Sequence, residues 1–393
     1  MSKTAKAKRS KKVAKREKRV KDENTYFDYS LLAVIVFLIC FGLVMLYSTS
    51  SYSAQGKWGN DMFYFGKQAL ISLASVFVML FVSKIDYHWY SKVAKFSYFA
   101  SIFLMFLVLT PIGIEAYGAR RWIKIPVFGQ LQPAEFAKIA IIIFIPVIIC
   151  RLGKKVKTWK GMGEIFAWGA VNAACVFLIT DNLSSAIIVM GITCGMIFVI
   201  HPKTAPFLVV GGTGLAGIVI MVRFLGKYMV ESDDFRWGRI VAWLDPEGNS
   251  AEGAFQTMQG LYAIGSGGFF GKGLGSSTQK MIIPEVQNDM ILSIICEELG
   301  VFGAIIVLLL FGFMLYRLLF IAQNAPDMYG SLIVTGIFAH IAIQVVLNIA
   351  VVTNLIPTTG ITLPFISYGG TSIVFLMAEM GIAFGVSRKI RIE

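Results

Sequence analysis

The chain has 393 residues, of which 56% are hydrophobic and only 15% are charged, and its mean hydropathy is +0.70. Soluble domains carry about 25% charged residues, so this composition excludes a soluble protein and indicates a polytopic membrane protein. The net charge is +13, and much of it lies in residues 1–24, which hold eleven Lys or Arg against three Asp or Glu.

The N-terminal basic run stands directly before the first apolar segment. Such a run can bind nucleic acid, but its position favours orientation by the positive-inside rule, with attraction to anionic lipid. It is too long and too charged for a signal peptide, and no small-residue cleavage site follows it. We therefore predict a basic cytoplasmic tail over residues 1–28, a retained first span and no nucleic-acid partner.

Ten apolar runs are long enough to cross about 30 Å of hydrocarbon. They lie near residues 29–49, 66–84, 96–113, 134–151, 163–180, 183–200, 205–224, 289–320, 329–352 and 366–387. Basic residues concentrate at 84–95, at 151–160 and after the last run, all on the side of the N-terminal tail. The sequence predicts an all-α polytopic fold with about ten transmembrane helices and both termini in the cytoplasm. One membrane domain would span residues 29–387, followed by a short basic tail over 388–393.

The first notable outer segment, residues 114–133, carries three cations against the positive-inside trend, namely Arg120, Arg121 and Lys124. Cations on this side of a membrane call for an anionic partner, and lipid phosphate is the obvious one. The alternative is a simple membrane-surface anchor, with Trp122 in the aromatic belt.

A pair of opposite charges, Glu135 and Lys138, follows at the start of the next span. Residues three apart share one face of a helix, so the two side chains could neutralise each other. The spacing leaves this structural pairing and a ligand-binding role equally open.

The long outer loop over residues 225–288 is rich in aromatic residues, so we expect it to be ordered and functional rather than disordered. Its glycine stretch, 265–275, suggests a phosphate loop but lacks the required spacing, because Gly273 follows Lys272 where Ser or Thr should stand. What remains is a backbone that can approach a ligand closely, with Lys272 as a point charge. The alternative is a tight re-entrant turn.

Asp289 stands at the mouth of the next apolar helix, and Glu297 and Glu298 lie about 12 Å deeper at ~1.5 Å per residue. Ionisable groups at membrane depth are candidates for function. An Asp or Asn before an apolar helix is also a typical N-cap, and Asn288 could take that role and leave Asp289 at the interface. Partial desolvation would then raise the pKa of Asp289 toward the range of a general base. The two glutamates are expected to pair with cations from other spans.

The last outer turn, residues 354–372, is rich in Pro, Gly and Thr and is expected to place irregular backbone in a cavity. The five cysteines all lie in apolar runs and the three histidines are far apart, so the sequence shows no metal-ligand spacing.

Taken together, several strings resemble the SEDS family (shape, elongation, division and sporulation), the FtsW, RodA and SpoVE group of peptidoglycan glycosyltransferases. The matching strings are Gly118-Ala119-Arg120-Arg121-Trp122-Ile123, Gln132-Pro133-Ala134-Glu135 with Lys138, Arg239-Ile240, Leu244-Asp245-Pro246, Gln256, Gln259, Pro284-Glu285 with Asp289, Glu297-Glu298-Leu299-Gly300 and the turn from Asn354 to Gly370. The string 274–280 is closer to the division and sporulation branch than to the elongation branch.

The resemblance implies ten transmembrane helices and the polymerisation of lipid II into glycan strands at the outer face of the bacterial cytoplasmic membrane. The leaving group would be undecaprenyl pyrophosphate. The resemblance also implies a class B penicillin-binding protein as transpeptidase partner, together with other divisome or elongasome membrane proteins.

Asp289 matches the family's catalytic aspartate and would take the proton of a sugar 4-hydroxyl that attacks an anomeric carbon with inversion. The departing pyrophosphate needs charge stabilisation, which is expected from Arg120, Arg121, Lys138 and Lys272. The other expected substrate-binding residues are Gln132, Glu135, Glu285 and Ser367. The resemblance implies no certain cofactor, and a divalent cation (Mg²⁺ or Mn²⁺) is left open.

The sequence departs from the family pattern at a few positions. Gln287 and Asn288 replace His-Thr before the aspartate, Met290 replaces Phe after it, and Asn182 stands at an acidic position. These departures concern substrate placement rather than the reaction.

Two other functions stay open. A lipid II flippase or transporter would use polar residues inside the spans, such as Glu135, Lys138, Glu298 and Glu379. It would need polar groups through the full depth of the membrane, whereas here they gather near the outer face. A non-catalytic scaffold for a division transpeptidase would tolerate replacement of Asp289.

Overall fold

The computed structural model describes residues 26–116, 119–125, 129–201 and 254–391, together with a few positions between the last two ranges (209, 212, 213, 217, 239, 240, 243 and 244). The helices in this part of the chain are α2 (Tyr29–Trp58), α3 (Phe63–Val82), α4 (His88–Leu107), α5 (Pro133–Leu152), α6 (Trp159–Thr180), α7 (Leu183–Ile200), α10 (Phe255–Gly267), α11 (Ile291–Asn324), α12 (Met328–Val352) and α13 (Ser372–Ser387). Three short strands, β1 (Gly113–Ala116), β2 (Ala119–Ile125) and β3 (Gly129–Leu131), complete the elements described.

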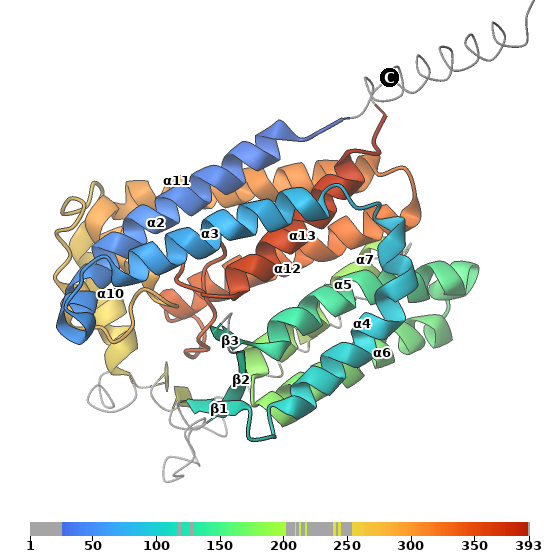
Figure 1. Cartoon of the computed structure of the whole chain (residues 1–393), viewed down its shortest axis with the longest axis horizontal. Coiled ribbons are helices and arrows are strands. Elements are labelled where there is room, and N and C mark those ends of the chain that lie inside the picture. Colours follow the sequence, from blue (N-terminus) through green and yellow to red (C-terminus); the bar gives the residue numbers. More distant parts are fainter. Residues whose placement is uncertain are drawn as a thin grey trace, which may run out of the picture.

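Seven of these helices are long and apolar enough to cross a membrane, namely α2, α3, α5, α6, α7, α11 and α12. The shorter apolar helix α13 and the helix α4 lie in the same bundle (Figure 1). Each of nine predicted spans overlaps one of the described helices, and the predicted span 205–224 lies outside the described residues except for four positions. The chain is therefore a multi-pass, mostly helical membrane protein, as predicted.

Helix α4 begins eight residues before the span predicted at 96–113. The Asp86 side chain accepts the backbone amide of His88 at 3.0 Å, which satisfies an orphan donor at the start of the helix. The chain leaves the helix after Leu107 and turns into β1 at Gly113. The apolar residues 108–112 are therefore a turn and not the end of a span.

A three-stranded antiparallel sheet in the order β1-β2-β3 is an addition to the all-helical prediction. Gly113 pairs with Ile123, a bulge interrupts the register between Ile114 and Glu115, and Ile123 pairs in turn with Leu131. The sheet lies at the end of α4 and the start of α5 (Figure 1). It therefore holds the outer cationic segment in an extended conformation.

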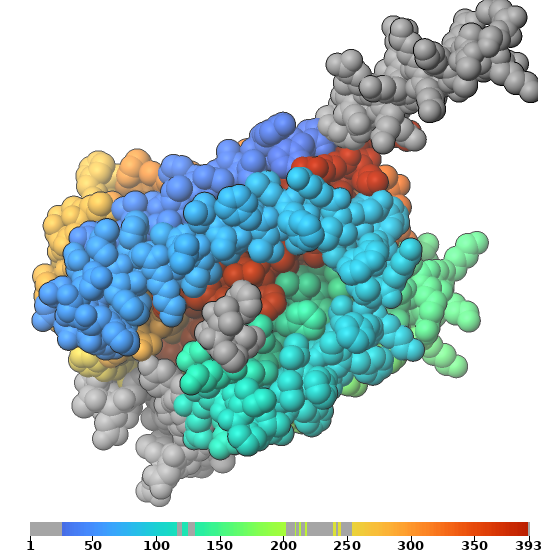
Figure 2. Space-filling view, in the orientation of Figure 1, coloured from blue at the N-terminus to red at the C-terminus, as the bar shows by residue number. Residues whose placement is uncertain are grey.

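The bundle is assembled from pairs of helices that are often distant in sequence. Helix α3 packs on α13, α11 on α12, α4 on α5 and α6 on α7, while α12 also contacts α5 and α7. In Figure 2 the surface of the C-terminal segment (red) is recessed between α3 and the region of α4 and α5. Helix α12 contacts α11 and α13 as well as α5 and α7. It therefore joins these two sets of helices.

Both described ends of the chain meet at one end of the bundle. The Tyr26 amide donates to the Ile390 carbonyl at 3.4 Å, and Lys389 pairs with Asp86 at 2.9 Å. Asp28, which is buried, accepts the Leu31 amide at the start of α2 and pairs with Arg317 of α11 at 2.8 Å. Residues 26–28, assigned above to the basic tail, therefore belong to the packed domain.

Helix α11 is interrupted at Gly300, whose φ of 70° and ψ of −171° are not helical. The glycine-rich segment after α10 fills the break: the Lys272 amide donates to the Glu297 carbonyl at 2.9 Å, and the Val301 amide donates to the Gly268 carbonyl at 3.0 Å. A Cβ on Gly267 would lie 1.9 Å from the Cys296 carbonyl oxygen, so the approach requires glycine. The glycine stretch is thus a tight turn that packs into the break of α11.

Glu297 and Glu298 are fully buried beside this break. Glu297 accepts from the Lys272 ammonium at 2.7 Å, and Glu298 accepts from the Ser48 hydroxyl at 2.7 Å and from Lys280 at 3.4 Å. The predicted pairing with cations is confirmed, but the prediction that these cations come from other spans is wrong. Lys272 and Lys280 belong to the segment between α10 and α11. This segment packs into the break of α11 and so places both lysines beside the glutamates.

Candidate active site

Asp289 lies in the connection just before α11 and is half-buried. Its Oδ1 accepts from the Gln256 side-chain amide at 3.4 Å, and its backbone carbonyl accepts from the Asn348 side-chain amide at 2.9 Å. Neither predicted cap is realised, because the N-cap of α11 is Met290 and no side chain caps it. The Asn288 amide instead donates to Glu285 at 3.1 Å. The Asp289 carboxylate therefore does not cap the helix.

Burial is the main influence on this carboxyl group and raises the pKa of Asp289 above its ordinary value. The positive charge of Arg239 and the hydrogen bond from Gln256 act in the opposite direction, while the negative charge of Glu285 adds to the rise. A carboxylate with a raised pKa is a better proton acceptor than an ordinary aspartate, as a general base requires.

The turn between α12 and α13, residues 353–371, forms a wall next to Asp289. Two amides of α12 hold it: Asn348 donates to the Ile361 carbonyl at 2.7 Å and Gln344 donates to the Thr362 carbonyl at 3.0 Å. A Cβ on Gly360 would lie 4.0 Å from the Asp289 Oδ2. The prediction of irregular backbone in this outer turn is confirmed, and the turn is fixed by the helix that also holds the Asp289 carbonyl.

Two guanidinium groups lie near this wall. Arg121 donates to the Asp181 carbonyl at 2.9 Å, and Arg239 donates to the Thr358 carbonyl at 3.2 Å. Burial lowers the pKa of Arg239, the neighbouring charge of Arg121 lowers it further, and Asp289 raises it. Arg239 is therefore electrostatically coupled both to Arg121 and to the Asp289 carboxylate.

Three of the predicted cations make ion pairs of their own. Arg120 pairs with the exposed Glu115 at 3.2 Å, and Lys272 pairs with Glu297 as described above. Lys138 and Glu135 are both buried in α5 and pair with each other at 2.8 Å, which confirms the structural pairing that their spacing allowed. Substrate roles for these residues stay predictions.

The remaining predicted substrate-binding residues lie around the same end of the bundle as Asp289. Gln132 is half-buried at the N-cap of α5, and Glu285 is exposed with a φ of 46°. Ser367 is buried in the outer turn, where its hydroxyl oxygen accepts the Leu363 amide at 2.8 Å. The Ser367 hydroxyl thus stabilises the turn that faces Asp289.

Sequence reasoning assigned no role to three residues that the structure brings to Asp289. Arg239 and Gln256 occur in the strings that carry the family resemblance, which was a usable signal. Asn348 is an amide within an apolar span, and polar groups at that depth are candidates for function. Their convergence depends on the packing of α10 and α12 against α11.

The arrangement suits proton abstraction next to an anion. Asp289 can accept a proton from a hydroxyl group, while Arg239 supplies positive charge beside it and Arg121 adds positive charge next to Arg239. Within the described ranges, no group of three His, Cys, Asp or Glu side chains lies together in a way that could hold a metal ion.

A family model described as "Cell cycle protein", which covers FtsW, RodA and SpoVE, matches residues 29–392. Stage V sporulation protein E of Bacillus subtilis (strain 168) is 38% identical over 367 residues, which cover 93% of this chain and 98% of that protein. A probable peptidoglycan glycosyltransferase FtsW of Geobacter sp. (strain M18) is 34% identical over 369 residues, with 93% and 98% coverage.

Two solved structures share the fold. A chain of a peptidoglycan synthase complex, described for the structural coordination of polymerization and crosslinking, superposes with a TM-score of 0.76 at 24% identity, covering 93% of this chain and 98% of that one. The rod shape determining protein RodA of Thermus thermophilus gives a TM-score of 0.64 at 24% identity, with the same coverage.

Proposed function

Because the chain belongs to the cell cycle protein family of FtsW, RodA and SpoVE, we propose that it is a peptidoglycan glycosyltransferase that polymerises lipid II into glycan strands. The observation that carries this proposal is the half-buried carboxylate of Asp289 beside Arg239, which in turn lies near Arg121, at one end of the bundle. The relatives named above are of the SpoVE and FtsW type, in line with the branch that the sequence favoured.

In the proposed reaction, Asp289 takes the proton from the 4-hydroxyl group of the acceptor sugar. The hydroxyl oxygen attacks the anomeric carbon of the donor, the new glycosidic bond forms with inversion, and the bond to pyrophosphate breaks. The lipid pyrophosphate leaves with the bonding electrons, so negative charge grows on its oxygens. Arg121 and Arg239 are positioned to stabilise that charge.

The polar residues inside the spans favour an enzyme over a flippase. Glu135 pairs with Lys138, and Glu298 pairs with Lys280, so both glutamates are engaged in buried ion pairs. Deeper in the bundle, Glu379 contacts His340 at 2.7 Å, and both side chains are 1% exposed. Each of these acidic groups is thus engaged by a basic side chain, whereas a translocation path needs polar groups that are open to a lipid headgroup.

The orientation follows from the charges. The end at which both described termini meet carries the basic connection 151–160, so we place it in the cytoplasm and Asp289 at the outer face of the bacterial membrane. We propose a class B penicillin-binding protein as transpeptidase partner, since a similar chain was solved in a complex for polymerization and crosslinking. A requirement for Mg²⁺ or Mn²⁺ is tested by adding a chelator.

The test uses the purified chain in liposomes, with and without the transpeptidase, supplied with labelled lipid II. We expect a ladder of labelled glycan strands on a gel. Movement of labelled lipid between leaflets without polymer would favour the flippase, and neither product in the presence of the partner would favour the scaffold.

Replacing Arg239 by Gln is expected to move the acid limb of the pH–rate profile to higher pH. Asp289 acts as a base only when deprotonated, and its positive neighbour Arg239 lowers its pKa. Without that charge, the carboxyl group stays protonated up to a higher pH. The measurement is the rate of polymer formation against pH, with Lys124→Gln, an exposed cation on β2, as the control. Coincident acid limbs in the Arg239 variant and the wild type would contradict the electrostatic coupling.

A further inference from the structure

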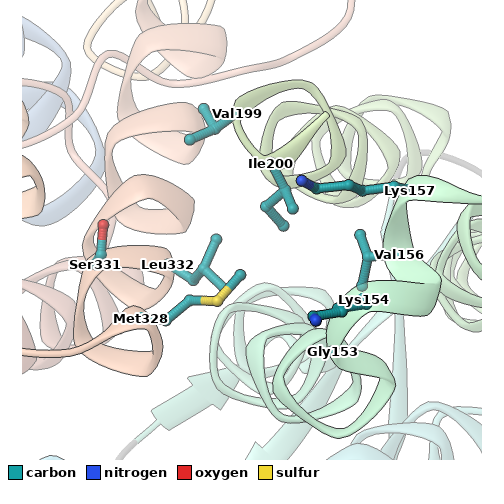
Figure 3. A pocket seen from close by; sticks show the side chains of 9 residues that line it. All are labelled: Gly153, Lys154, Val156, Lys157, Val199, Ile200, Met328, Ser331 and Leu332. Atoms are coloured by element: carbon teal, nitrogen blue, oxygen red, sulfur yellow. The ribbon is translucent and has the colours of Figure 1, made fainter. Parts of the chain in front are cut away.

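A cavity of about 370 Å³ opens at the end of the bundle opposite to Asp289 (Figure 3). It lies between the 3-10 turn that follows α5, the end of α7 and the start of α12. Met328 on its wall is 20 residues before Asn348 on the same helix, a separation of about 30 Å at ~1.5 Å per residue. The cavity is therefore separate from the candidate active site.

The wall of the cavity is apolar and its rim is basic. Val156 and Leu332 are each 2% exposed and form the buried part, while Met328 and Val199 are largely exposed on the α12 and α7 sides. In Figure 3 the side chains of Lys154 and Lys157 extend from the 3-10 turn, and both ammonium groups face the open space. One ligand can therefore meet apolar contacts and two positive charges together.

Three cations at this end of the bundle are paired with acidic side chains, and Lys154 and Lys157 are not among them. Arg151 pairs with Glu164 at 2.9 Å, Arg317 pairs with Asp28 and Lys389 pairs with Asp86. Among the described residues, neither Lys154 nor Lys157 has an acidic side chain within ion-pair distance. Two like charges at one rim attract an anion, because an anion between them removes their mutual repulsion.

The place of the cavity in the bundle indicates which anion fits. Helices α5, α7 and α12 are all candidate membrane spans, and their ends meet here, at the depth where lipid headgroups lie. An inorganic phosphate would contact the lysines but leave the exposed Val199 and Met328 uncovered. A phospholipid satisfies both features, since its phosphate meets the ammonium groups and its acyl chain covers the apolar wall.

We propose that this cavity binds an anionic phospholipid of the inner leaflet, with Lys154 and Lys157 on the phosphate and the acyl chain against Val199, Met328 and Leu332. The bound lipid would contact three helices at once and hold their inner ends together. A ligand that binds only the folded state raises thermal stability, so the lipid is expected to stabilise the protein.

The experiment compares the wild type with the double variant Lys154→Gln/Lys157→Gln. Its matched control, Lys155→Gln/Lys160→Gln, removes the same charge from exposed lysines of the same connection that do not line the cavity. Each protein is placed in phosphatidylcholine nanodiscs with or without phosphatidylglycerol. Retained phosphatidylglycerol is measured by native mass spectrometry, and the unfolding midpoint is measured by a thermal melt.

We expect the double variant to bind phosphatidylglycerol about 30-fold more weakly than the wild type, from about fivefold for each lysine near a membrane surface. Phosphatidylglycerol should no longer raise the unfolding midpoint of the double variant. The control variant should keep both the binding of phosphatidylglycerol and the raised midpoint. Equal retention by the wild type and the double variant would overturn the proposal, and so would an equal loss in the control. Inorganic phosphate and glycerol phosphate serve as headgroup probes, and stabilisation by either to the same extent as by the lipid would overturn the lipid as ligand.

Discussion

The Asp289→Asn protein is expected to form no detectable glycan polymer from labelled lipid II, with a loss of rate of about 10²- to 10⁴-fold, the contribution of a positioned general base. Asparagine cannot take the proton of the attacking hydroxyl group, while it has nearly the same size as aspartate. The backbone bond from Asn348 to residue 289 and the contact with Gln256 can both persist. The loss should therefore appear in the chemical step without a loss of folded protein.

Two measurements separate this result from a folding defect. The unfolding midpoint of Asp289→Asn should match the wild type, and binding of labelled lipid II should be retained. Asp61→Asn, the same chemical change at an outer carboxylate that accepts from Tyr47 at 3.1 Å, should polymerise at the wild-type rate. Polymer formed at equal rates by the Asp289 variant and the wild type would remove Asp289 from the mechanism and favour the scaffold.

The second large effect is expected on stability, from replacing Glu297 by Ala. This buried carboxylate accepts from Lys272 at 2.7 Å, from the Thr278 amide at 3.2 Å and from the Thr278 hydroxyl at 3.1 Å. Removing one partner of a buried ion pair costs about 3–5 kcal/mol, because the other partner is left desolvated. Lys272 is 33% exposed and can turn to water, so a loss of about 3 kcal/mol is expected.

The measurement is denaturant or thermal unfolding of the variant in the detergent used for the wild type. Glu164→Gln provides the matched control, since it breaks a surface ion pair with Arg151 whose side chains are 67% and 38% exposed. Exposed pairs contribute at most about 1 kcal/mol. If the Glu297 variant and this control have the same unfolding midpoint, the turn formed by the glycine stretch does not depend on the buried Glu297 carboxylate.

Most of the fold could be predicted because crossing a membrane leaves a strong pattern in the sequence. Runs of apolar residues identify spans regardless of which face packs inward, and nine of the ten predicted spans overlap a described helix. The sheet was missed since β1 and β3 have only four and three residues, too few to show an alternating pattern. The pairing of those strands, rather than their local sequence, makes them β-structure.

The candidate site was predictable only in part. Asp289 stands out locally, as an acid before an apolar run, but the prediction that Asn288 or Asp289 caps the helix was wrong. The carbonyl of Asp289 is held from α12 by Asn348, so the chain enters α11 at an angle set by tertiary contacts. Likewise the partners of Lys272 could not be predicted, because they depend on a loop that descends beside a broken helix.

The break at Gly300 has a mechanical consequence. A continuous helix from Ile291 to Asn324 would act as a lever about 50 Å long at ~1.5 Å per residue. Any rocking of the end at Asn324 would then displace Asp289. The interruption makes the outer piece a short helix of two to three turns, bonded sideways to the glycine segment and followed by a separate inner piece. We therefore expect a torque on the piece after Gly300 to be taken up at residue 300, which would leave Asp289 aligned with the turn 353–371.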